Sequence, residues 1–332
     1  MIAVLTVGGV VVAQWNALSG ILGLSAHALY ETLRLYLPQL PAENYWAVLG
    51  IAAALIAAMY GLLLVGRYSF FEKVLVFFVT LMAVSFIISI VFALPQPAEM
   101  AAGLVPRIPD RPGANLMVAA FVGTTMAAPT FVVRPLLMKG KGWRAAQRRQ
   151  QSRDSFVAAA VMFLISGSIM ACAAGALYHQ GKPVTKVLDM IATLEPVAGK
   201  FAVVLFMTGA LSAGLSSIFP IAMVCPLLVA DYRAGKLDTR STTFRVLAGV
   251  ACLVGLTVPV LGANPILAQI ATQVANVFVL PLVIAGITYL VNCRDYMGPH
   301  RAGPLLNLGL AAAFVFSCVI SWTGVVALSS FF

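Results

Sequence analysis

Long apolar runs separated by short polar connections organise this chain. A helix of about 20 residues spans the hydrocarbon core of a bilayer and closes its own backbone hydrogen bonds there. We predict nine transmembrane helices, at about residues 2–24, 46–66, 70–94, 114–138, 155–178, 200–229, 243–261, 266–291 and 304–329. An interfacial stretch to Tyr36 follows the first helix. The pattern predicts an all-α polytopic membrane protein.

Composition and charge refine this prediction. Of the 332 residues, 61% are hydrophobic and 10% are charged, against about 25% charged in soluble domains. We therefore attribute the net charge of +10 to basic loops that face the cytoplasm, and not to nucleic-acid binding. The connections after even-numbered helices contain fourteen Lys and Arg residues, and those after odd-numbered helices contain six. The positive-inside rule then predicts a plasma (inner) membrane protein whose first helix starts in the cytoplasm and whose C-terminus lies outside.

Ionisable side chains are scarce at membrane depth. Carboxylates lie at predicted helix ends or in loops, and the three histidines are peripheral; these residues include Glu72, Asp154, Asp189, Glu195, Asp231, His27, His179 and His300. The five cysteines are scattered and form no C-x-x-C pair. Because proton relays and active sites need titratable groups at depth, we expect no enzyme activity and no resident cofactor.

The fourth apolar run contains residues that favour unwinding at mid-membrane. Pro129 lacks an N–H and clashes with the carbonyl of Thr125, and Gly123 and Thr124 lie just before it. An unwound stretch exposes carbonyl oxygens, which are hard ligands for a cation. The alternative is an ordinary proline kink, which membrane helices tolerate.

Three amides lie on one face of the eighth predicted helix. Gln269, Gln273 and Asn276 are spaced i, i+4, i+7, so they share that face. In a membrane helix such groups must face protein or water. They serve either as hydrogen bonds between helices or as contacts to a substrate, and the sequence leaves both open.

Four segments resemble, in order and spacing, parts of the natural-resistance-associated macrophage protein (Nramp) family of divalent-metal transporters. They are G-T-T-M-A-A-P-T-F-V-V-R-P at 123–135, L-S-A-G-L-S-S at 211–217, Gln273-Val274 followed by Pro281, and Tyr296-Met297-Gly298. They are similar to the family's broken sixth helix, its eighth helix, its tenth helix and the turn after the tenth. The resemblance implies a LeuT-like inverted-repeat fold of the APC superfamily, in which the nine helices correspond to the family's third to eleventh.

The resemblance also implies an organisation for the chain. Residues 1–94 would hold helices three to five of the first repeat, residues 95–291 the second inverted repeat with its broken helix at 114–138, and residues 292–332 an additional C-terminal helix. The family's first two helices, whose D-P-G-N motif supplies Asp and Asn metal ligands, have no counterpart in this sequence. We therefore expect a missing N-terminal segment or a partner chain to supply those ligands.

Departures from the family pattern suggest which ion is carried. The family's metal-binding methionine falls on Ala127, and its two histidines fall on Pro129 and Arg134. A thioether favours soft transition metals, and its loss is shared with the Nramp-related magnesium transporters. The resemblance therefore implies transport of partly hydrated Mg²⁺, without proton coupling of the family type.

Candidate metal-site residues come from the same comparison. The family's carbonyl ligand falls on Thr124 and its tenth-helix amide on Gln273, while Ala127 replaces the thioether. We add Thr125 and Asn276 as partners for bound water. Two other functions stay open: transport of an organic solute such as an amino acid, because broken helices also hold carboxylates, and a non-transporting membrane fragment that needs a partner chain.

Overall fold

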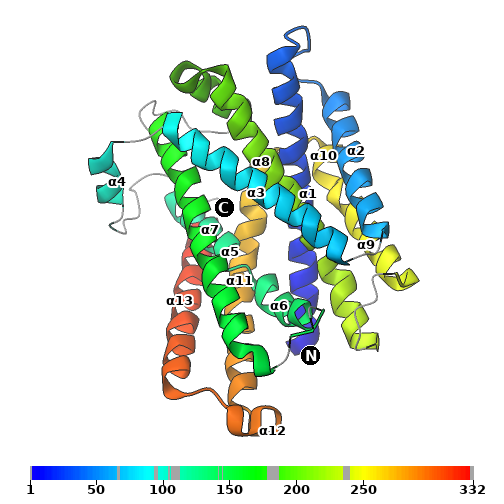
Figure 1. Ribbon diagram of the computed structural model, residues 1–332, viewed down its shortest axis with the longest axis vertical. Helices are drawn as coiled ribbons and strands as arrows, with labels where there is room; N and C mark the ends of the chain where they lie inside the picture. Colours follow the sequence, from blue (N-terminus) through cyan, green and yellow to red (C-terminus); the bar gives the residue numbers. More distant parts are fainter. Residues whose placement is uncertain are drawn as a thin grey trace. The chain divides into compact units, whose positions relative to one another are not determined.

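The apolar runs fold into helices close to their predicted positions in this computed structural model (Figure 1). The structure describes residues 2–65, 68–92, 96–103, 105, 113–140, 142–143, 145–177, 187–234 and 240–329. Within these ranges nine helical segments are long and apolar enough to cross a membrane. The all-α polytopic class is thereby confirmed.

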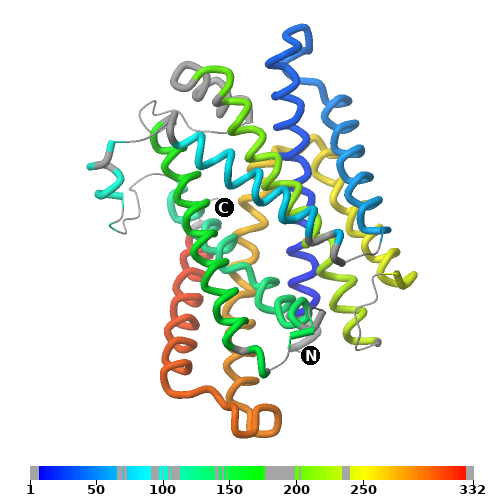
Figure 2. The backbone as a smooth tube through the Cα atoms, in the orientation of Figure 1, coloured from blue at the N-terminus to red at the C-terminus, as the bar shows by residue number. Residues whose placement is uncertain are grey.

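The α-helices follow one another with short connections. They are α1 (Ile2–Tyr36), α2 (Tyr45–Leu64), α3 (Tyr68–Phe92), α4 (Pro97–Gly103), α5 (Ala114–Thr125), α6 (Ala128–Gly140), α7 (Arg148–Leu177), α8 (Val187–Ala234), α9 (Thr242–Gly255), α10 (Thr257–Leu261), α11 (Pro265–Asn292), α12 (Arg294–Met297) and α13 (Pro304–Ser329). The backbone path is traced in Figure 2. The predicted fourth and seventh helices are each divided, into α5 and α6 and into α9 and α10.

The first helix is longer than predicted. The apolar run weakens near Leu24, but α1 continues unbroken to Tyr36. The segment from Ser25 to Tyr36 contains no Gly or Pro and is rich in Ala and Leu, which favour helix. Pro38 follows, and the residue before a proline is pushed out of helical conformation. The predicted interfacial stretch is therefore the last part of α1.

The eighth helix contains a break near the predicted start of the sixth transmembrane helix. Gly199 has φ 71° and ψ 171°, a conformation outside the helical region that glycine adopts at little cost. The apolar part of α8 therefore begins next to the predicted start at Lys200. The loop prediction for Asp189 and Glu195 is wrong, because both lie within α8; their side chains are outside the described residues.

Contacts between Cα atoms divide the chain into two compact units. Unit 1 contains Met1–Ala17, Arg107–Leu137 and Leu267–Phe332; unit 2 contains Leu18–Pro106 and Met138–Ile266. Each unit joins segments that are distant in sequence, and α1, α6 and α11 contribute to both. This division does not test the repeat boundaries implied by the family resemblance, which stay a prediction.

Unit 2 has an apolar core built by α3, α7 and α8 with the second half of α1. Phe86 and Phe206 pack edge to face, with ring centroids 5.3 Å apart. Gly214, in the small-residue segment of α8, lies against the Ser25 side chain of α1. The absence of a side chain at Gly214 therefore permits close packing of α8 on α1. In the same unit α2 lies beside α9 and α10 (Figure 1).

Unit 1 joins α5, α11 and α13. Ala119, Ala120 and Val274 form a buried cluster between α5 and α11. α13 packs against α5, and the Ser321 hydroxyl of α13 donates to the carbonyl of Val277 in α11 at 2.9 Å. These contacts hold the three helices against one another.

A pair of asparagines closes the connection between α11 and α13. Asn292 Nδ2 donates to Asn307 Oδ1 at 2.8 Å, and Asn307 Nδ2 donates back to Asn292 Oδ1 at 3.0 Å. Next to this pair, the backbone N–H of Ala302 donates to the carbonyl of Val291 at 3.1 Å. These hydrogen bonds therefore hold α11 against α13 at the end of α11.

Candidate metal centre

The predicted interruption of the fourth transmembrane segment is present. α5 ends at Thr125 and α6 begins at Ala128, and Met126 between them has φ −102° and ψ 45°. The N–H of Met126 makes the last bond of α5, to the Val122 carbonyl at 2.8 Å. The Thr125 carbonyl cannot receive the usual bond from four residues ahead, because Pro129 has no N–H.

A carbonyl near the interruption lacks its helical partner. The N–H of Thr130 donates to Ala127 O at 2.9 Å at the start of α6. Within the described ranges, the carbonyl of Gly123 receives no backbone N–H. Such oxygens are hard ligands of the type that Mg²⁺ and Ca²⁺ prefer.

Gly123 allows α5 to approach α11 at backbone distance. A Cβ built at Gly123 would collide with the carbonyl of Gln273 and lie 3.0 Å from the Val277 side chain. Any larger residue would push the two helices apart, so glycine is required here. The interruption therefore begins directly beside the amide-bearing part of α11.

The amides of α11 face protein and keep acceptor capacity. Asn276 is 2% exposed, and its Nδ2 donates to Gln273 Oε1 at 3.1 Å. Asn276 Oδ1 and Gln269 Oε1 are buried and accept no hydrogen bond. A buried oxygen without a partner costs about 1–3 kcal/mol. The one amide-to-amide bond in this part of the described chain lies within α11 and not between helices, and the choice between hydrogen bonding and ligand contact stays a prediction.

The structure places all five predicted site residues in unit 1. Thr124 and Thr125 are exposed at the end of α5, and Ala127 is half-buried in the interruption. The Thr125 hydroxyl donates to the Phe121 carbonyl at 2.8 Å, so its proton is used within its own helix. Contact between Gly123 and Gln273 brings the two predicted segments together, while the role of each residue stays a prediction.

The donors gathered here are neutral oxygens and amides. Throughout the part of the chain that the structure describes, no group of three or more His, Cys, Asp or Glu residues could hold a metal ion. Neutral oxygen donors suit hard cations more than soft ones. They do not balance the charge of a divalent ion, so such an ion would keep water around it or need an anionic ligand from elsewhere.

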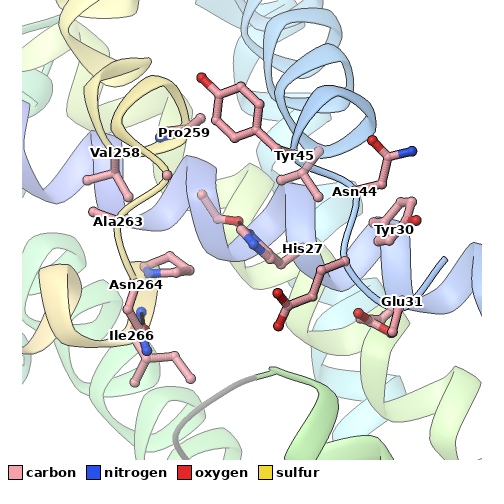
Figure 3. A pocket seen from close by; sticks show the side chains of 16 residues that line it. His27, Tyr30, Glu31, Asn44, Tyr45, Val258, Pro259, Ala263, Asn264 and Ile266 are labelled. Carbon is pink, nitrogen blue, oxygen red and sulfur yellow. Dashed lines mark hydrogen bonds between the residues drawn. The ribbon is translucent and has the colours of Figure 1, made fainter.

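A cavity in unit 2 was missed by the sequence analysis (Figure 3). His27, Glu31 and Tyr30 line it from the end of α1, in the stretch that was predicted to be interfacial. The signal was available in the sequence, because Gly23, His27 and Glu31 are spaced by four residues and share one helical face. We call this cavity the His27 pocket.

Together, nine apolar membrane-length segments in the described ranges and an interrupted helix packed on an amide-bearing helix define a multi-pass α-helical membrane protein. A family model described as natural resistance-associated macrophage protein-like matches residues 2–327. The chain belongs to the Nramp family, and the family resemblance read from the sequence is confirmed.

Individual relatives are more distant. The chain is 28% identical over 230 residues to the divalent metal cation transporter MntH of Deinococcus radiodurans, a match covering 67% of this chain and 51% of that protein. It is 25% identical over 244 residues to the divalent metal cation transporter MntH of Vibrio campbellii, covering 73% and 56%. The chain spans about half the length of these curated relatives.

Proposed function

We propose that this chain takes part in the transport of a divalent metal cation across the plasma membrane. The observation that carries the proposal is the interruption between α5 and α6, which follows closely on the contact of Gly123 with the backbone of Gln273 in α11, the helix that also carries the unpaired amide oxygens of Gln269 and Asn276. Relatives over much of the chain carry the name divalent metal cation transporter. Mid-membrane carbonyls beside amides form a binding site of the kind that transporters build at broken helices.

The cation is Mg²⁺, carried partly hydrated. Ala127 gives the interruption a methyl group in place of sulfur, and the amides of Gln269 and Asn276 supply oxygen. Mg²⁺ takes oxygen ligands and keeps several waters when bound. A site without sulfur gives no advantage to softer transition metals.

Uptake proceeds without proton coupling. The positions of the family's two histidines carry Pro129 and Arg134, so neither position has an imidazole to relay a proton. The membrane potential supplies the driving force, because moving two charges through about 100 mV is worth about 4.6 kcal/mol.

A further segment or a partner chain supplies the carboxylate. The described residues of the candidate metal centre are neutral donors, and burying a divalent charge among neutral groups alone is costly. We expect an Asp and an Asn from outside the present chain to complete the site.

Ion flux into proteoliposomes tests the proposal. The chain is reconstituted alone and together with a longer form or partner chain, and Mg²⁺ entry is followed under an inside-negative potential. We expect potential-dependent Mg²⁺ entry in the completed protein, with no acidification of the lumen and only weak competition by Mn²⁺. Proton entry coupled to Mg²⁺ would refute the uncoupled mechanism. Uptake of an amino acid insensitive to Mg²⁺ would instead establish the organic-solute alternative.

A further inference from the structure

The first half of α7 is exposed on all sides, although it belongs to a membrane-length helix. Every residue from Ser152 to Leu164 is exposed. The second half packs on α3 and α8 (Figure 1), where Cys172 is fully buried in the apolar core of unit 2. The first half therefore meets the surrounding bilayer and not its own chain.

A stripe of exposed residues follows one face of this half. Its members are spaced by four and three residues and so share that face; they are Arg149, Arg153, Phe156, Ala160 and Phe163. The two phenylalanines are 76% and 74% exposed. At about 3.6 residues per turn, the buried residues Ile165 and Cys172 lie about 150° round the helix from Arg149. We call the five residues the Arg149 stripe.

The sequence around the stripe is strongly basic. Residues 139–154 contain six Lys or Arg residues and one acidic residue, Asp154, which is also the one carboxylate between Asp110 and Asp189. Such an excess of positive charge attracts anions and repels cations. It therefore favours a lipid headgroup with a net negative charge over a zwitterionic one, which carries an ammonium group beside its phosphate.

The two arginines lie at the depth of lipid headgroups. No charged residue occurs from Ser155 to Leu177, and the apolar span of α7 lies within Arg149–Gly175. At about 1.5 Å per residue, Arg153 precedes Phe156 by about 4 Å and Arg149 precedes it by about 10 Å along the helix. The headgroup layer is about 5–8 Å thick on each side of the hydrocarbon. Because an arginine stem can extend along apolar surface while its guanidinium stays in the polar layer, both guanidinium groups reach that layer.

The stripe combines the two chemistries of a phospholipid. A guanidinium group binds phosphate through paired N–H donors and stays charged at physiological pH. Further along the helix, Ala160 has only a methyl group between the positions of Phe156 and Phe163, so an acyl chain has room to lie against the helix there. A soluble anion would use the arginines alone, whereas a lipid uses the whole stripe.

We propose that the Arg149 stripe binds an anionic phospholipid of the bilayer, with the phosphate on Arg149 and Arg153 and one acyl chain along the apolar residues. The proposal goes beyond the proposed function and does not depend on which ion is carried. Loop charges predict that this end of α7 lies in the cytoplasmic leaflet, where anionic lipids attract basic segments next to a membrane helix. The bound lipid covers a half of α7 that the chain itself leaves exposed.

Quenching of tryptophan fluorescence by brominated lipids tests the proposal on the full chain in vesicles. The native tryptophans are replaced by phenylalanine, and Phe163→Trp supplies a probe on the stripe. Vesicles contain phosphatidylglycerol and phosphatidylcholine, brominated one at a time, so that quenching gives the relative affinity of the two lipids at the probe. We expect a preference for phosphatidylglycerol that falls about fivefold or more in Arg149→Gln/Arg153→Gln, because each basic residue near the surface contributes about fivefold.

The matched control is Arg294→Gln/Arg301→Gln, which removes two exposed arginines from the connection between α11 and α13 on the same predicted side of the membrane. It should leave the preference at the Phe163→Trp probe unchanged. Quenching by phosphatidylcholine should persist in every variant, which shows that α7 still lies in the bilayer.

Three results would overturn the proposal. An equal loss in the two double variants would show that the net charge of the chain attracts the lipid without a site. An equal preference at a probe on α13, placed by Val315→Trp at an exposed position, would show the same. A Phe163→Trp probe that neither lipid quenches, with the chain alone or with a longer form or partner chain, would show that a protein segment covers the stripe.

Discussion

Single side chains decide the chemistry of the candidate metal centre. Ala127 places a methyl group in the interruption, where a thioether would favour soft metals. Gly123 sets the spacing between α5 and α11, since a Cβ there meets the Gln273 carbonyl. The sequence predicted the interruption and the amide face, because proline chemistry and helical periodicity are local. It did not reveal that Asn276 pairs with Gln273 within α11, because that bond depends on how buried side chains are oriented.

We expect Ala127→Met to raise the affinity for Mn²⁺ and Cd²⁺ relative to Mg²⁺, because the variant adds a thioether to a site of hard donors. Calorimetric titration of each ion measures the ratio. Ala127→Leu is the matched control, with similar volume and no sulfur. An unchanged affinity ratio in the methionine variant would remove Ala127 from the site.

Gly123→Ala should destabilise the protein and abolish transport. The added methyl group forces α5 away from the Gln273 carbonyl, and overpacking of this kind costs about 1–3 kcal/mol. Thermal unfolding and flux are the measurements. Gly286→Ala, in the facing helix α11 and with open space around its Cβ position, should leave both near wild type. Equal behaviour of the two variants would contradict the close contact.

At the scale of elements, a helix does not have to end where its apolar run ends. Hydropathy falls after Leu24, which led to the prediction of a short first helix, yet α1 continues to Tyr36. Its last turns carry His27, Glu31 and Arg34, which make hydrogen bonds within α1 itself. Polar groups satisfied in this way do not end a helix. By contrast, the interruption at Met126 was predictable because a missing N–H acts on the carbonyl only four residues away.

Pro129→Ala should close the interruption. An alanine N–H can donate to the Thr125 carbonyl, so α5 and α6 could join and withdraw backbone oxygens from the site. We expect slower amide hydrogen exchange over 126–130 and reduced cation flux. Pro135→Ala, which removes a proline inside α6, is the control and should leave exchange over 126–130 unchanged. Fast exchange in Pro129→Ala would show that other contacts hold the helix open.

At the scale of the whole molecule, contacts between segments that are distant in the chain could not be predicted from the sequence. The long apolar runs predicted the nine membrane-length segments and their order. They gave no reason for Tyr45 to donate to Val260, or for Gly123 to meet Gln273, because these contacts join segments 215 and 150 residues apart. Such pairs depend on tertiary packing, which no local pattern encodes. Loop charges, on the other hand, predict one property of the whole chain, its orientation.

Labelling with a membrane-impermeant maleimide tests that orientation. In a background where the other cysteines are replaced, Cys293 at the end of α11 should react only from the cytoplasmic side. Ala42→Cys in the connection before α2 should react only from outside, because the positive-inside rule places these two connections on opposite faces. Reaction of both from one side would refute the assignment.

The asparagine pair at the end of α11 has a mechanical consequence. Asn292 and Asn307 fasten α11 to α13, Ser321 joins them again further along, and Gly123 seats α5 against α11. Because α11 contacts its neighbours at several points along its length, it cannot slide or tilt independently of α5 and α13. If the protein alternates between conformations open to either side of the membrane, α5, α11 and α13 should move together as one rigid body. The interruption after α5 would then keep its position relative to the amides of α11 in both conformations.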